Sequence, residues 1–146
     1  MRRTLGWLLL SLLCTWGFAR TAGAEVEATD DLTLYDARVT DTQGVTTDLR
    51  EFGYATGVNV LMAYRGDADV EIPYRLIRRI EISAYVPQNR RAPASVTLRS
   101  GKTIAIELDN IEEGRLLRGA AEFGEFRIRL GKVRRLELFG ASTTAP

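Results

Sequence analysis

The chain has 146 residues, with 20 Lys or Arg and 19 Asp or Glu, so its formal net charge is +1. It contains no histidine and a single cysteine, Cys14. These counts exclude a Ser-His-Asp triad, a Cys-His pair, an internal disulfide and a zinc site made of His and Cys. The length allows one or two small domains.

The first 24 residues have the pattern of an export signal. Met1-Arg2-Arg3 is a basic start, and residues 5–18 form an apolar run that is long enough for a signal core and too short to span a membrane. Ala22-Gly23-Ala24 then offers small residues for cleavage. We expect a signal helix over 1–24, cleavage after Ala24, and a periplasmic or secreted bacterial protein.

Removal of the signal would take away Cys14, both tryptophans and three arginines, and the net charge would fall to 17 − 19 = −2. Lipid attachment at Cys14 is less favoured, because bulky Leu13 stands where a small residue is normally required. The remaining charge is uneven. Residues 25–74 carry eleven acids and three bases, and residues 75–146 carry eight acids and fourteen bases. We interpret this polarity as two halves that dock on each other; a basic face for an anionic partner is the alternative.

Short strands separated by turns are predicted for the mature chain. Residues 25–31 lack periodicity and should be a flexible lead-in. Beyond them, alternation of apolar and polar residues is typical of half-buried strands. The predicted strands are 32–40, 45–52 and 58–64 in the first half, and 96–99, 103–108 and 115–123 in the second.

One stretch occurs twice: residues 70–82 align without a gap with residues 126–138, at an offset of 126 − 70 = 56. In both copies an alternating strand leads into three residues that fit one 3₁₀ turn, and a second alternating strand follows. Ile72, Arg78, Arg79 and Glu81 are matched by identical residues. We infer a duplicated unit of five short strands. The predicted divisions are a first unit at 32–83, a linker at 84–94, a second unit at 95–140 and a disordered tail at 141–146.

A strand, a 3₁₀ turn and a closing strand resemble the end of small SH3-like and Sm-like barrels, and Ile72-Pro73 followed by Ile77 carries this resemblance. Leu34-Tyr35-Asp36 is similar to part of the Ala-Leu-Tyr-Asp-Tyr stretch near the start of SH3 domains. The resemblance implies an all-β fold of two tandem five-stranded SH3-like or Sm-like barrels. One continuous β-sandwich built from the duplication is the alternative.

The resemblance does not carry proline-rich peptide binding to this chain, because no tryptophan pair follows in the mature sequence. Tyr35 and Pro73 would be the candidates for such a groove. Since proline lacks a backbone N–H, Pro73 also predicts that its strand lies near a sheet edge or ends there.

Adjacent arginines are the most noticeable polar feature. Arg78-Arg79 and Arg134-Arg135 occupy matching places in the two copies, and Arg90-Arg91 lies in the predicted linker. Alternation predicts that Arg79 and Arg135 point outward beside Glu81 and Glu137, as on a solvent-exposed face with weak ion pairs. Arg78 and Arg134 stand where the turn meets the strand, and a guanidinium there fits a carboxylate or phosphate. The candidates for contact with an anion or a partner are Arg78, Arg79, Arg134 and Arg135.

Other patterns do not indicate catalysis. Gly53-x-x-x-Gly57 reads as a pair of turn glycines, not a phosphate loop. Asp67-Ala68-Asp69-x-Glu71 offers oxygen ligands for calcium but lacks the spacing of a calcium loop, and alternating acids are common on exposed strand edges. We expect no catalytic residue, no cofactor and no metal ligand.

These features predict a non-enzymatic, exported binding or assembly module of the bacterial cell envelope. Its expected partner is a protein or an anionic envelope component, not nucleic acid, and we expect no transmembrane span after cleavage. Two alternatives stay open. One is a carboxylate-based envelope enzyme or enzyme accessory, with or without calcium. The other is a self-associating structural subunit driven by its oppositely charged halves.

Overall fold

The computed structural model of the chain describes residues 33–57, 59–83 and 91–141. The predicted signal peptide (1–24), the lead-in (25–31), positions 84–90 of the predicted linker and positions 142–146 of the predicted tail lie outside these residues. Among the described residues, no helix is long and apolar enough to cross a membrane.

The described part of the chain is built from ten antiparallel strands, so the prediction of an all-β fold is confirmed. In chain order the elements are β1 (Tyr35–Asp41), β2 (Thr46–Tyr54), β3 (Val60–Arg65), β4 (Ala68–Pro73), the 3₁₀ turn η1 (Tyr74–Leu76), β5 (Ile77–Ile82), β6 (Arg91–Leu98), β7 (Thr103–Asp109), α1 (Asn110–Gly114), β8 (Leu116–Ala121), β9 (Gly124–Arg129), the 3₁₀ turn η2 (Leu130–Lys132) and β10 (Val133–Ala141).

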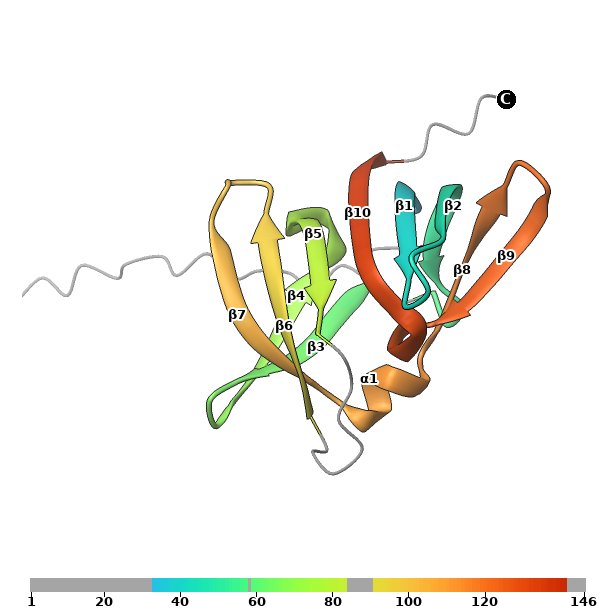
Figure 1. Cartoon of the computed structure of the whole chain (residues 1–146). Helices are drawn as coiled ribbons and strands as arrows, with labels where there is room; N and C mark the ends of the chain where they lie inside the picture. Colours follow the sequence, from blue (N-terminus) through green and yellow to red (C-terminus); the bar gives the residue numbers. More distant parts are fainter. Residues whose placement is uncertain (1–32, 58, 84–90, 142–146) are drawn as a thin grey trace, which may run out of the picture.

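The strands form one sheet in the order β4-β3-β7-β6-β5-β10-β1-β2-β8-β9. Two groups of five strands meet at the β5–β10 pair, and Figure 1 shows them side by side with α1 below their junction. The group β4-β3-β7-β6-β5 takes β6 and β7 from the second half of the chain, and the group β10-β1-β2-β8-β9 takes β1 and β2 from the first. Five consecutive strands therefore do not make up one unit of the sheet. The predicted units 32–83 and 95–140 each contribute strands to both groups.

The two copies of the repeated stretch have the same local structure. β4, η1 and β5 begin at positions 68, 74 and 77, and β9, η2 and β10 begin 56 residues later. The first hairpins of the two units, β1–β2 and β6–β7, also match. The Thr40 and Thr46 hydroxyl oxygens lie 3.1 Å apart, as do those of Thr97 and Thr103. The first unit of the chain and the second thus fold locally in the same way.

A local twofold axis passes between Ile80 and Leu136. These counterparts face each other across the β5–β10 pair, with Arg135 opposite Glu81 and Glu137 opposite Arg79. Ile80 therefore pairs with its own counterpart, and each flanking residue pairs with the counterpart of the residue on the other side of Ile80. The equivalent crossing hydrogen bonds support the axis: Thr42 N–H donates to Lys132 O at 3.0 Å, and Arg99 N–H donates to Leu76 O at 2.9 Å.

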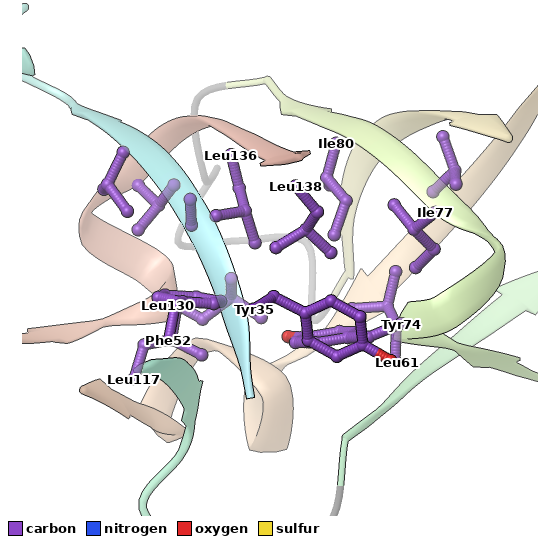
Figure 2. Packing of buried hydrophobic residues seen from close by; sticks show 14 of the residues in the cluster. Tyr35, Phe52, Leu61, Tyr74, Ile77, Ile80, Leu117, Leu130, Leu136 and Leu138 are labelled. Atoms are coloured by element: carbon purple, nitrogen blue, oxygen red, sulfur yellow. The ribbon is translucent and has the colours of Figure 1, made fainter. Parts of the chain in front are cut away.

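One hydrophobic core extends through both groups of strands. Figure 2 shows Ile80, Leu136 and Leu138 close together at the junction, with Leu61, Tyr74 and Ile77 on one side and Phe52, Leu117 and Leu130 on the other. All of these side chains are buried. Ile77 and Val133, the residues that follow the two 3₁₀ turns, are buried at equivalent positions. Since the core is shared, neither group of strands encloses its apolar residues alone.

The second unit begins earlier than the sequence indicates. β6 starts at Arg91, whereas the predicted unit starts at 95 and counts residues 91–94 as linker. Ala92 and Ala94 are buried, and exposed Pro93 between them points the other way. Small alanines give a weak strand pattern, and Pro93 indicated a linker.

The expectation that Pro73 lies near an edge is confirmed. β4 is an edge strand of the described sheet, and Pro73 is its last residue.

Candidate functional site

The outward face of β5, β6 and β10 carries the four predicted arginines. Arg79 pairs in register with Glu137 of β10, and Arg135 pairs with Glu81 of β5. The neighbouring Ile80 and Leu136 point into the core, so these charged side chains share the opposite face.

Equivalent β-bulges explain why Arg78 and Arg134 are exposed next to the outward-facing Arg79 and Arg135. The pairing of β5 with β6 shifts between Ile77 and Arg79, and it skips Arg78. The pairing of β1 with β10 shifts between Arg135 and Val133, and it skips Arg134. A bulge adds a residue to one strand and redirects its side chain. Arg78 and Arg134 are exposed for this reason, although strict alternation would turn them toward the core.

Two shallow hollows lie along this face. The first has a volume of about 530 Å³ and is lined by Arg78, Arg79, Thr97, Arg99, Glu137, Leu138 and Phe139. The second has a volume of about 410 Å³ and is lined by Glu81, Ile82, Ser83, Pro93, Ala94, Ser95, Arg134 and Arg135. We call Arg78, Arg79, Arg99, Arg134 and Arg135 the arginine strip. Five guanidinium groups thus stand against the two glutamates of the hollows.

Ion pairs on the arginine strip leave most of its positive charge available. Arg135 Nη2 lies 2.9 Å from Glu81 Oε1, and Arg79 Nε lies 4.0 Å from the same oxygen. These side chains are about half exposed, so each pair contributes about 0–1 kcal/mol. Arg99 is held by the backbone, since its Nε donates to Arg75 O at 3.0 Å and its Nη1 to Phe139 O at 2.7 Å. Arg78 and Arg134 have no ion pair within the part of the chain that the structure describes, and a fixed guanidinium beside such side chains favours binding of an anion.

A second concave site, which the sequence did not indicate, lies between β3 and β4 of one group and β2 and β8 of the other, next to the end of α1. This cleft has a volume of about 550 Å³ and is lined by Tyr54, Ala55, Thr56, Val60, Met62, Glu71, Gly114, Arg115 and Leu116. Its walls are mainly apolar, and Met62 and Leu116 are partly exposed there. Largely apolar clefts with a few polar groups are the usual form of small-molecule sites.

A buried polar cluster lies next to the cleft. Glu112 in α1 is only 2% exposed; it accepts a hydrogen bond from the Tyr54 hydroxyl at 3.1 Å, and its Oε1 lies 2.8 Å from Arg115 Nε. The Arg115 guanidinium also lies 5.2 Å from the centre of the Tyr54 ring. The Tyr74 ring packs 5.2 Å from that of Tyr54, and the buried Tyr74 hydroxyl makes no hydrogen bond within the described residues.

Burial sets the protonation of this cluster. It raises the pKa of Glu112, while the positive charge of Arg115 and the hydrogen bond from Tyr54 oppose the rise. Burial also raises the pKa values of Tyr54 and Tyr74, so both hydroxyls are protonated at neutral pH. The cluster therefore positions a buried carboxylate between one guanidinium and one hydroxyl donor.

Helix α1 lies between the predicted strands 103–108 and 115–123, in a segment where the predicted elements include no helix. The Asp109 carboxylate accepts a hydrogen bond from the Glu112 backbone N–H at 3.0 Å, which caps the start of the helix. The Asp-x-x-Glu spacing of Asp109 and Glu112 is the signal that would have indicated a helix start. No local pattern links Glu112 to Tyr54, because the two residues are 58 positions apart.

The remaining sequence candidates have structural places. Tyr35 is buried in the core. Gly53 approaches Asn59 closely, since an added Cβ would lie 3.0 Å from Asn59 Oδ1, and Gly57 has a φ of +83° in a turn. Arg91 packs 3.8 Å from the centre of the Tyr64 ring and pairs with Glu107 at 3.3 Å.

The proposed calcium residues lie on an exposed hairpin. Asp67 is in the turn before β4, and Asp69 and Glu71 are exposed on β4 itself. Within the described ranges, no group of three or more His, Cys, Asp or Glu residues is placed to hold a metal ion.

Comparisons of the sequence with protein-family models and with curated proteins gave no match.

Proposed function

We propose that the chain is a non-enzymatic binding or assembly module of the bacterial cell envelope and that its arginine strip contacts an anionic component or an acidic protein surface. The observation that carries this proposal is the two equivalent bulges, which expose both arginines of each pair on one face. Guanidinium groups bind carboxylates and phosphates in a two-pronged geometry. The absence of histidine from the whole sequence favours binding over acid–base catalysis.

The proposal includes export and excludes nucleic acid as a partner. Its support is the sequence of residues 1–24, which has the basic start, apolar run and small residues of an export signal. Phosphate headgroups of lipids, carboxylates of the cell wall and acidic protein surfaces are the anions available there.

The strand order supports two SH3-like barrels that exchange strands. Read from the β5–β10 pair outward, one group is β10-β1-β2-β8-β9 and the other is β5-β6-β7-β3-β4. If the strands are numbered one to five within each unit (β1–β5 and β6–β10), both groups have the order fifth, first, second, third, fourth. We propose that a duplicated five-stranded unit forms both groups and that the units swap their first hairpins, β1–β2 and β6–β7. The arginine strip then lies at the seam created by the duplication.

The test compares the wild-type chain with the double variant Arg78→Glu, Arg134→Glu. The probes are vesicles containing phosphatidylglycerol, purified peptidoglycan and a polyglutamate peptide. We expect at least one anionic probe to bind and the double variant to bind it at least about tenfold more weakly, because two fork-forming donors become acids. The control is Arg50→Glu, Arg65→Glu, which reverses two exposed charges outside the arginine strip.

Binding of none of the three probes would contradict the proposal, as would equal weakening in the control. Neutral phosphatidylcholine vesicles should bind neither the wild type nor the variants.

A further inference from the structure

The described sheet is open, and its two ends are counterparts of each other. β4 pairs only with β3, and β9 pairs only with β8. β4 and β9 occupy equivalent positions 56 residues apart. An edge strand carries backbone N–H and C=O groups without partners along one side, which can pair with a strand of another chain.

The two edges have opposite charge. On β4 the exposed outward residues are Asp69 and Glu71, and Asp67 precedes them in the turn; we call these three the acidic edge. On β9 the exposed charged residues are Glu125, Arg127 and Arg129; we call the two arginines the basic edge.

One pair of matching positions has opposite charge. Glu71 of the first copy corresponds to Arg127 of the second, since 71 + 56 = 127. Arg118 of β8 lies opposite Arg127 in register and adds to the positive charge there. Glu125 forms an exposed ion pair with Arg127 at 2.9 Å, which offsets part of this charge.

We propose that copies of this chain associate head to tail, with β4 of one copy pairing antiparallel to β9 of the next, so that Glu71 faces Arg127 and Asp69 faces Arg129. Two acidic edges repel each other, as do two basic edges, so the charges favour the unlike pair. Antiparallel pairing continues the pattern of every strand pair in the described sheet.

The register also brings together two exposed apolar residues. Phe123, which precedes β9, is 77% exposed, and Leu76, which follows β4 in η1, is 47% exposed. When Glu71 faces Arg127, position 123 of the second copy falls opposite position 75 of the first. Phe123 and Leu76 then lie at the same end of the contact, where burying them adds to the association.

The contact is weak and salt-dependent by construction. Its ion pairs are exposed and contribute about 0–1 kcal/mol each, and β4 and β9 have six residues each. A contact between two different edges does not close on itself within a dimer, so the average mass should rise with concentration instead of stopping at two copies.

The test is sedimentation of the full chain over a range of concentrations, at low salt and at about 1 M salt, where the Debye length is about 3 Å. One variant, Asp69→Lys with Glu71→Lys, makes both edges basic. The other, Arg127→Glu with Arg129→Glu, makes both edges acidic. We expect the wild type to grow at low salt and to dissociate at high salt, and each variant alone to stay monomeric.

An equimolar mixture of the two variants should associate again, because each variant supplies the edge that the other has lost. This rescue separates edge pairing from a loss of folding. A monomeric wild type at low salt, or a mixture that stays monomeric although both variants fold, would overturn the proposal.

The arginine-strip variant Arg78→Glu, Arg134→Glu should associate like the wild type. Association lost in that variant would assign the contact to the strip and overturn the edge proposal. Failure of the edge test leaves anion binding by the strip unaffected, since the two surfaces are probed by different variants.

Discussion

At the scale of single residues, Glu112 is the least expected feature of the molecule. A carboxylate that is 2% exposed costs free energy unless it is paired, and here Arg115 and Tyr54 both contact it. The buried cluster next to the cleft therefore depends on residues from β2, from α1 and from the position between α1 and β8. Sequence periodicity cannot bring these together, because it reports only neighbours along one element.

Glu112 should make the stability of the chain depend on pH. Its folded pKa is raised above the ordinary value of 4.5, mainly by burial, so the folded state holds this proton more tightly than the unfolded state. The stabilisation is complete below the unfolded pKa and is lost as pH rises through the folded pKa. We expect the free energy of unfolding of the wild type, relative to Glu112→Gln, to fall as pH rises from about 4. Urea unfolding of both proteins at several pH values measures this difference. A difference that is constant or grows with pH would contradict the prediction.

At the scale of elements, the repeated stretch and most strands could be predicted from the sequence. Alternation is a local property, and in Val70, Ile72 and Ile80 it directly reports which side chains face the core. The bulges at Arg78 and Arg134 could not be predicted, because a bulge depends on the register of the neighbouring strand. Alternation accounts for the outward direction of Arg79 and Arg135, whereas the bulges account for the exposure of Arg78 and Arg134. Contact of these four arginines with an anion or a partner stays a prediction.

Gly119 tests the contact between β2 and β8, which come from different copies. An alanine Cβ at this position would lie 3.1 Å from Arg50 O and 3.1 Å from Leu49 Cβ, both in β2. We expect Gly119→Ala to lower the free energy of unfolding by about 1–3 kcal/mol, since the backbone of β2 must move.

Gly140→Ala is the matched control, because an added Cβ there meets no atom within 4 Å. It should change the free energy of unfolding by about 0.5 kcal/mol or less. Denaturant unfolding of both variants decides the matter, and equal losses would show that packing against β2 is not the cause.

At the scale of the whole molecule, the order in which strands pair could not be predicted. The hairpin β1–β2 meets β10 and β8, although the similar strands β5 and β3 are nearer in the chain. Because the apolar faces of the two copies are similar, alternation is compatible with pairing of β1–β2 to strands of either copy. The connection between the copies and the shared core decide between them, and neither is visible in a local pattern.

The proposed exchange of the hairpins β1–β2 and β6–β7 predicts that the two copies stay associated when the chain is cut between β5 and β6. Five strand pairs join them: β1–β10, β2–β8, β3–β7, β5–β6 and β5–β10. We expect a chain with a protease site inserted between β5 and β6 to remain a one-to-one complex after cleavage. Native mass spectrometry before and after cleavage measures this, and thermal unfolding of the uncut chain should show a single transition. Separation of the fragments under native conditions would contradict the prediction.

The axis between Ile80 and Leu136 has a consequence for how this protein can evolve. Each copy contributes strands to both groups, so neither copy can diverge as an independent domain. Differences between the copies, such as Tyr74 against Leu130 or Glu71 against Arg127, accumulate instead as a contrast between two ends of a single body. The duplication that we propose would thus have created polarity within one molecule.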